Sequence, residues 1–129
     1  MSVIPILVFF GGGAGAVCRH FVGQAVRQNL PDTHLFLGTM ACNVSGCLVI
    51  GFAAALAAGS PVAENPFFRH FLLVGFLGGY TTFSTFGLET LALFQGGEYR
   101  LAAANALLTV VACLLGVALG SGLGNLLRS

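Results

Sequence analysis

Four long apolar stretches alternate with three short polar connections along the chain. The apolar stretches cover residues 4–26, 35–58, 67–94 and 101–127. A helix needs about 20 apolar residues to cross the hydrocarbon core of a bilayer, so each stretch is long enough. Pro31, Pro61 and Pro66 stand in or beside the connections, where a helix can stop. The pattern predicts an all-α membrane protein, with residues 1–129 forming one domain of four transmembrane helices.

Composition supports a membrane location. Hydrophobic residues make up 57% of the 129 residues and charged residues 7%. A soluble domain this short cannot bury so much apolar surface. The net charge of +1 argues against a nucleic-acid partner. No nucleophile–base pair, metal cluster or phosphate loop stands in a polar setting, which argues against an enzyme.

Small residues recur within the spans. The four cysteines, Cys18, Cys42, Cys47 and Cys113, lie in apolar runs and form no CxxC pair, so we interpret them as small buried side chains. Glycine and cysteine also recur at four-residue spacing, which lets helix backbones approach closely in lipid. These stripes are Gly11/Gly15, Gly38/Cys42/Gly46 and Gly116/Gly120/Gly124. They favour close helix packing and dimerisation.

The arginines give no orientation in the membrane. With four spans, Arg27 and Arg100 fall on one side, and Arg69 and Arg128 fall on the other. Arg19 lies within the first span. Because two arginines oppose two, the positive-inside rule does not choose a direction. The chain is therefore expected to insert both ways and to form antiparallel, dual-topology homodimers.

The third span contains a polar interruption. Gly78 and Gly79 are adjacent, and Thr81 and Thr82 follow, a combination that makes a poor helix interior. We predict a break near residues 78–82, with its freed backbone groups covered by protein or a water-filled cavity. Freed carbonyls can coordinate a cation, and a half-helix N-terminus can face an anion. The alternative is a continuous helix whose hydroxyls bond back to carbonyls.

The residues after the break favour an anion path. Phe83 and Phe86 share a face if a helix begins there, and Thr82, Ser84 and Thr85 supply hydroxyl donors around them. Phenyl rings have a positive edge, which can meet an anion without a fixed charge that would trap it. The alternative is that both rings are packing residues.

Other polar residues lie inside the spans. Asn43, and Asn105 with Thr109 four residues later, can line a path or hold helices together, and the sequence leaves both open. Arg19 can extend to the interface or attract anions to a vestibule. For Glu89, we favour an ion pair with an arginine over proton coupling.

Together these residues resemble the Fluc/CrcB fluoride channels. The run Gly75–Phe86 closely resembles the signature of that family. The glycines of residues 11–15 with Arg19, and Asn43 in the second span, resemble its first two spans. Asn105 resembles a polar position in its fourth.

The resemblance implies an antiparallel homodimer with two pores that passively export fluoride across a bacterial-type plasma membrane. It implies a structural sodium ion (Na+) at the dimer centre, held by the main-chain carbonyls of Gly78 and Thr81. Fluoride would meet Phe83, Phe86 and Asn43.

Further assignments follow from the same resemblance. Arg19 would be the vestibule arginine, and Asn105 and Thr109 would fall on a polar track along the pore. Thr82, Ser84 and Thr85 would complete the fluoride pathway. Tyr80 departs from the family, which often has leucine there.

Two other functions remain to be separated from a channel. A four-span, proton-coupled small-molecule exporter needs a carboxylate at mid-membrane, and Glu89 is the candidate. Fluoride flux that survives Glu89→Gln would exclude it. A non-transporting membrane scaffold would show no flux at all, with or without Phe83→Ile.

Overall fold

The computed structural model describes residues 2–28, 30, 34 and 36–128, and these residues contain helices but no strand. The four long helical spans are Ile4–Arg27, Phe36–Ala57, Phe67–Gln95 and Tyr99–Arg128, and each is apolar enough to cross a membrane. The first, second and fourth are the helices α1 (Ile4–Arg27), α2 (Phe36–Ala57) and α5 (Tyr99–Arg128). The predicted all-α fold with four spans is confirmed. Residue 35, at the predicted start of the second span, lies outside the described residues.

The third span is divided into three helical segments. A π-helical segment, η3 (Phe67–Leu77), leads into the short α3 (Gly78–Tyr80), and α4 (Phe83–Gln95) follows after a gap. A single 3-10 turn, η2 (Pro61–Glu64), connects α2 to this span.

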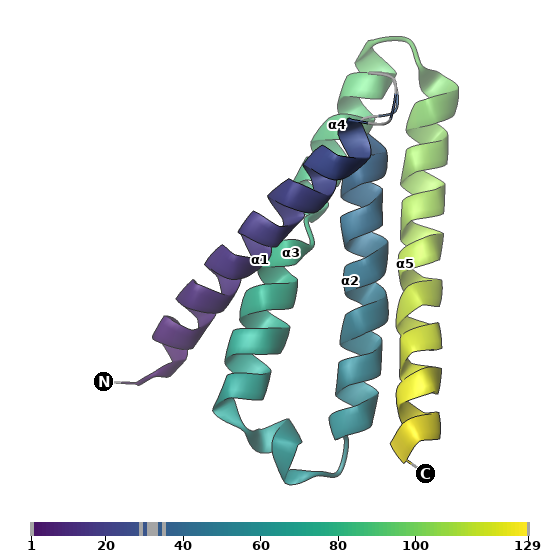
Figure 1. Cartoon of the computed structure of the whole chain (residues 1–129). Helices are drawn as coiled ribbons and strands as arrows, with labels where there is room; N and C mark the ends of the chain where they lie inside the picture. Colours follow the sequence, from purple (N-terminus) through teal and green to yellow (C-terminus); the bar gives the residue numbers. More distant parts are fainter. Residues whose placement is uncertain (1, 29, 31–33, 35, 129) are drawn as a thin grey trace.

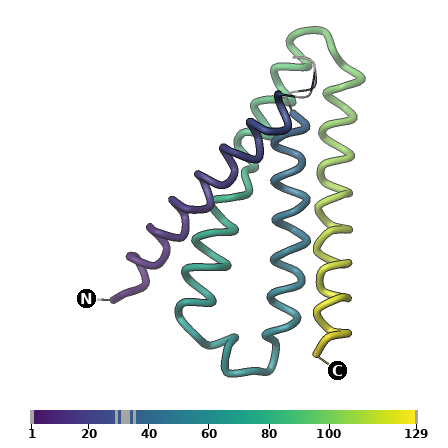
Figure 2. Tube along the Cα trace, viewed as in Figure 1, coloured from purple at the N-terminus to yellow at the C-terminus, as the bar shows by residue number. Residues whose placement is uncertain are grey.

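The spans pack in two pairs. Figure 1 shows α2 and α5 running side by side, while α1 crosses the bundle at a slant and lies against η3 and α3. The trace in Figure 2 places both termini at the end of the bundle that holds the η2 turn. At this end Arg128 Nη1 donates a 2.6 Å hydrogen bond to the carbonyl of Ala58, at the end of α2.

Glycines make these close pairings possible. A Cβ atom at Gly15 would collide with the carbonyl of Phe76 and lie 2.8 Å from the nitrogen of Tyr80. A Cβ at Gly120 would collide in the same way with the Leu48 carbonyl of α2. The stripes of α1 and α5 are therefore packing surfaces, against the third span and against α2. The stripe Gly38/Cys42/Gly46 of α2 faces α1 and the residues Tyr80 and Thr81.

The break lies at Thr81 and Thr82, within the predicted range of residues 78–82 and directly after α3. Both threonines are extended, with φ/ψ of −87°/156° and −152°/118°. Gly78 is helical, with φ −65° and ψ −36°. A Cβ at Gly79 would collide with the backbone of Gly12, so this glycine serves the packing of α1. Both glycines are thus helical, and the extended residues are the two threonines that follow.

The outward faces of the bundle are apolar. Leu107, Leu114 and Leu126 of α5 each expose more than half of their surface, at 67%, 67% and 72%. Phe9 and Phe10 of α1 are equally open, at 75% and 63%. In a bilayer these side chains contact lipid, so the exposure is expected of a membrane protein rather than a defect in its core.

Candidate functional site

Two hydrogen bonds between Asn43 and the Thr82 backbone stabilise the extended conformation at the break. The Thr82 N–H donates to Asn43 Oδ1 at 2.7 Å, and Asn43 Nδ2 donates to the Thr82 carbonyl at 3.0 Å. Both residues are buried. In a continuous helix the Thr82 amide would instead reach the carbonyl four residues back, that of Gly78. The side chain of α2 therefore takes the place of the helical partner and frees the Gly78 carbonyl.

Hydroxyl groups gather where α4 begins. Thr82 is the N-cap, and its Oγ1 accepts from the Thr85 N–H at 3.2 Å. The same hydroxyl lies 3.1 Å from Thr85 Oγ1 and 3.2 Å from Ser84 Oγ. A capped helix N-terminus carries a partial positive charge that favours anions. The predicted donors Thr82, Ser84 and Thr85 are thus one connected cluster.

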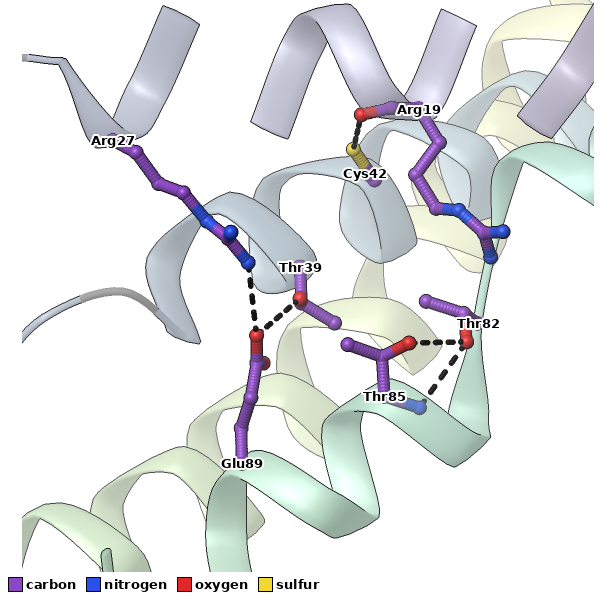
Figure 3. A network of polar contacts seen from close by, with 7 residues as sticks. All are labelled: Arg19, Arg27, Thr39, Cys42, Thr82, Thr85 and Glu89. Carbon is purple, nitrogen blue, oxygen red and sulfur yellow. Dashed lines mark hydrogen bonds and ion pairs between the residues drawn. The ribbon is translucent and has the colours of Figure 1, made fainter. Parts of the chain in front are cut away.

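Arg19 reaches into the bundle rather than to its end. Its Nη1 donates to the Thr81 carbonyl at 3.3 Å, as the slant of α1 brings it beside the break. Figure 3 shows the guanidinium next to Thr82, with the Arg19 carbonyl turned towards the Cys42 thiol. Of the two roles left open by the sequence, the structure favours the vestibule.

A cavity of about 620 Å³ lies beside this arginine. Its basic side chains come from the last turns of α1, and its far end reaches the break. The lining residues are Ala16, Arg19, His20, Gly23, Gln24, Arg27, Gln28, Gly38, Thr39, Cys42, Thr82 and Thr85. Among the described residues of this lining the charged side chains are Arg19 and Arg27, and their positive charge suits anions. We call it the vestibule.

Glu89 stands at the edge of the vestibule. Its Oε1 accepts from Thr39 Oγ1 at 2.9 Å and lies 3.6 Å from Arg27 Nη2 (Figure 3). The preferred pairing with an arginine is confirmed, and the partner is Arg27. Glu89 Oε2 is buried without a hydrogen-bond partner among the described residues.

A second cavity, of about 290 Å³, lies on the other side of the break. We call it the phenylalanine cavity because Phe83 and Phe86 line it, with ring centroids 5.2 Å apart and planes tilted by 46°. Phe86 is 8% exposed and Phe83 is 78% exposed. The other lining residues are Asn43, Cys47, Thr81, Thr82, Thr109, Val110, Cys113 and Leu114. Thr82 lines both cavities.

The polar residues of the fourth span join α5 to α4. Asn105 is 1% exposed, and its Nδ2 donates to Thr90 Oγ1 at 2.9 Å. Thr90 in turn donates to the Phe86 carbonyl at 2.7 Å, and Thr109 Oγ1 donates to Asn105 Oδ1 at 3.0 Å. Asn105 therefore links α5 to α4 and lies outside both cavity linings, whereas Thr109 bonds to Asn105 within α5 and lines the phenylalanine cavity.

Two further residues are placed clearly. The Tyr80 hydroxyl lies 2.9 Å from Ser45 Oγ, which ties α3 to α2. Ser84 is exposed and touches the site only through its contact with the Thr82 hydroxyl.

Sequence reasoning missed part of the vestibule. Thr39, Gln24 and Arg27 were not predicted as site residues, although Arg27 lies eight residues after Arg19, which is twice the four-residue spacing. His20 and Gln24 are themselves four apart, and residues at this spacing share a helix face. A polar face over the last turns of α1 was thus visible in the pattern.

Comparison with known proteins gives consistent matches over nearly the whole chain. The family described as CrcB-like protein, Camphor Resistance (CrcB), matches residues 6–121. Fluoride-specific ion channel FluC 2 of Nitrobacter hamburgensis is 43% identical over 118 residues, covering 92% of this chain and 94% of the relative. Fluoride-specific ion channel FluC of Coxiella burnetii is 39% identical over 119 residues, covering 92% and 95%. The Helicobacter pylori protein of the same name is 40% identical over 121 residues, covering 93% and 92%.

Proposed function

This chain belongs to the CrcB-like family, and from that premise we propose that it is a fluoride-specific ion channel that lets fluoride leave the cytoplasm passively. The family consists of ion channels rather than enzymes. The four apolar spans and the bacterial relatives make it a multi-pass protein of the plasma membrane. The observation that carries the route of the ion is the position of Thr82 between the two cavities.

Fluoride enters through the vestibule in this proposal. Arg19 and Arg27 line it and raise the local anion concentration there. Glu89 Oε1 lies 3.6 Å from Arg27 Nη2 and partly neutralises the positive charge of this arginine. A vestibule that attracts but does not trap is what conduction requires, because the ion must also leave.

The hydroxyls at the break then replace water around the ion. Fluoride is small and strongly hydrated, so a pore needs several donors at close range. Thr82 and Thr85 line the vestibule at the positive end of α4. Asn43 uses one Nδ2 proton on the Thr82 carbonyl, which leaves its second amide proton for an ion in the phenylalanine cavity.

Phe83 and Phe86 form the next part of the route. Their ring edges offer weak positive potential to fluoride as it passes from Asn43 towards Thr109. Phe83 lies at the open side of the cavity, because 78% of its surface is exposed on the single chain. A second copy of the chain covers this side in our proposal, in an antiparallel, dual-topology homodimer with two pores. The even division of the arginines between the two ends supports such a pairing.

A sodium ion at the centre of this dimer fits the carbonyls at the break. Carbonyl oxygens are ligands that hard cations prefer. The Gly78 carbonyl has lost its helical donor to Asn43, and the Thr81 carbonyl already accepts from the cationic Arg19. Gly78 and Thr81 of each copy would hold the ion, which would supply a fixed positive charge that joins the two subunits.

The channel proposal is tested by fluoride efflux from proteoliposomes, recorded with a fluoride electrode and compared with chloride efflux. We expect rapid fluoride efflux, no chloride efflux, and severe loss of fluoride efflux in Phe83→Ile and Phe86→Ile. Leu126→Ile, at an exposed aliphatic site on α5, is the control and should behave as wild type. Equal efflux of both halides, or unchanged efflux in both phenylalanine variants, would contradict the proposed route.

The sodium proposal has a separate test. Purification with N-methylglucamine in place of sodium should lower the temperature at which the dimer dissociates and reduce the flux, and added sodium should restore both. If dimer stability and flux stay unchanged without sodium, the central ion is excluded while the channel proposal stands.

A further inference from the structure

Two thiols meet in the wall of the phenylalanine cavity. Cys47 of α2 and Cys113 of α5 both line it, next to Phe83, Phe86 and Asn43. In the sequence Cys47 and Cys113 are 66 positions apart, and each was interpreted as a separate small side chain. The fold instead makes these two a pair that faces a shared space.

The packing of α2 on α5 brings the thiols together. The Cys47 Cβ lies 3.6 Å from the position that a Cβ would take at Gly116, and Cys113 is one turn before Gly116 on α5. The Cys47 and Cys113 side chains therefore line the same cavity from two helices that pack against each other. Neither forms a disulfide. Thr109, one further turn along α5, has its hydroxyl proton engaged by Asn105.

We propose that Cys47 and Cys113 form a binding site for a soft, thiophilic metal ion, and that an ion bound there blocks the fluoride route. The second clause rests on the proposed function, while the first does not. Thiolates select soft ions over hard ones. No cluster of three or more His, Cys, Asp or Glu residues occurs in the described part of the chain, so the site offers two sulfur ligands.

Two sulfur ligands restrict the kind of ion further. Zinc in protein sites takes four ligands, so this pair would hold it poorly. Mercury(II), silver(I) and copper(I) accept two ligands in a line. With mercury(II), each thiol loses one proton to water and forms one sulfur–mercury bond, without any oxidant. The product is neutral, which suits a lining that includes Val110 and Leu114.

An ion at this position would stop fluoride for two reasons. The cavity measures only about 290 Å³, and the ion would take up space beside the phenylalanine rings. The new bonds would also tie α2 to α5 at the level of the cavity, so its walls could no longer move apart as fluoride passes.

The first experiment measures fluoride efflux from proteoliposomes of the full-length protein treated with micromolar mercuric chloride. We expect wild type to lose most of its efflux and to recover it with a dithiol such as dithiothreitol. After a wash with an excess of a monothiol, which removes mercury held by a single sulfur, wild type should stay inhibited, whereas Cys47→Ser and Cys113→Ser should each regain most of their own untreated efflux. Cys18→Ser is the matched control, because Cys18 does not line this cavity, and it should be inhibited as wild type is.

The second experiment measures mercury bound per chain by mass spectrometry of the intact protein. It uses the Cys18→Ser background and an excess of a monothiol, which removes mercury held by a single sulfur. We expect one mercury per chain, and none when Cys47→Ser or Cys113→Ser is added. Gel filtration checks that each variant remains folded, and alanine replaces serine where one does not.

The outcomes separate the two proposals. No retained mercury in the Cys18→Ser protein, or equal retention after Cys47→Ser, overturns the metal site. Retained mercury with undiminished efflux overturns the block alone. Retained mercury in a protein that shows no fluoride efflux before treatment leaves the site in place and refutes the channel.

Discussion

Asn43 supplies the hydrogen-bond partners that the Thr82 backbone lacks at the break, as a neighbouring strand or helix turn does in regular structure. Its amide offers one donor and one acceptor in the arrangement of a peptide group, and the Thr82 backbone meets both. Because the pairing comes from another span, the extended backbone at Thr81 and Thr82 needs no water at this point. A side chain on α2 therefore decides where the third span stops being a helix.

We predict that Asn43→Leu, which keeps the volume but removes both hydrogen bonds, destabilises the protein. Leaving the buried N–H and C=O of Thr82 without partners should cost about 2–5 kcal/mol. Reversible unfolding in detergent measures this, and fluoride efflux should fall with it. Asn125→Leu, at an exposed position on α5, is the control and should change stability by less than about 0.5 kcal/mol. Equal effects of the two variants would show that the Asn43 pairing contributes little.

Individual residues also mark the limit of prediction from sequence. The break was expected from the glycines and the β-branched threonines together, yet Gly78 is helical and the extended Thr82 pairs with the distant Asn43. Such a partner, 39 positions away, leaves no trace in the local pattern. The sequence left two roles open for Arg19, at the membrane interface or in a vestibule, for the same reason. Only the slant of α1 decides which carbonyl the arginine reaches. The residue types thus indicated which groups could bind an ion, whereas contacts between spans determined the position of the break and the partner of Arg19.

Between helices, glycines were the most reliable guide. Repeats at four-residue spacing predicted close packing, and Gly15 and Gly120 do meet backbone atoms of a neighbouring span. The fourth span was harder to interpret. Asn105 and Thr109 lie on one face, and such a face can either line an ion path or hold helices together. Asn105 proved to be fully engaged with Thr90, whereas Thr109 also borders a cavity. Periodicity identifies a contact face but does not tell what the face contacts.

We predict that Gly15→Ala disrupts the packing of α1 on the third span. The added Cβ would meet the Phe76 carbonyl and the Tyr80 nitrogen, both of them rigid backbone atoms. Overpacking of this kind costs about 1–3 kcal/mol. Gly13→Ala is the matched control on the same helix, because no atom lies within 4 Å of the position of its Cβ. Thermal stability in detergent should fall for Gly15→Ala alone, because alanine is otherwise the better helix former. Equal losses in the two variants would contradict the contact with Phe76 and Tyr80 as the cause.

For the whole molecule, the even charge balance is the property with the widest effect. Arg27 and Arg100 lie at one end of the bundle, and Arg69 and Arg128 lie at the other with both termini. Arg19 contacts the break inside the bundle and so adds to neither end. The spans could be predicted from apolar length alone, but the pairing of α1 with η3 and of α2 with α5 could not. That pairing depends on how four apolar surfaces fit together in three dimensions.

We predict that one added positive charge fixes the orientation of the chain. Glu64→Lys raises the basic count at the terminal end to three against two and should place the termini in the cytoplasm. Glu98→Lys raises the count at the opposite end and should place the termini outside. A reporter fused to the C-terminus measures this, with a mixed signal expected from wild type.

Fluoride efflux checks the consequence for the antiparallel dimer. Each of these two variants, expressed alone, should lose fluoride export, and the two expressed together should restore it. Full export by either variant alone, with the reporter on one side only, would contradict the antiparallel arrangement.

The slanted α1 has a consequence for how the protein is made. A ribosome delivers the spans to the membrane one after another, and α1 finds its partners, η3 and α3, only after α2 has emerged. Likewise α2 waits for α5, the last span to be synthesised. The most extensive pairings, α1 with η3 and α2 with α5, each join spans that are not consecutive, so early spans must remain in lipid, or with a membrane chaperone, until those partners emerge. Final assembly thus becomes a post-translational event.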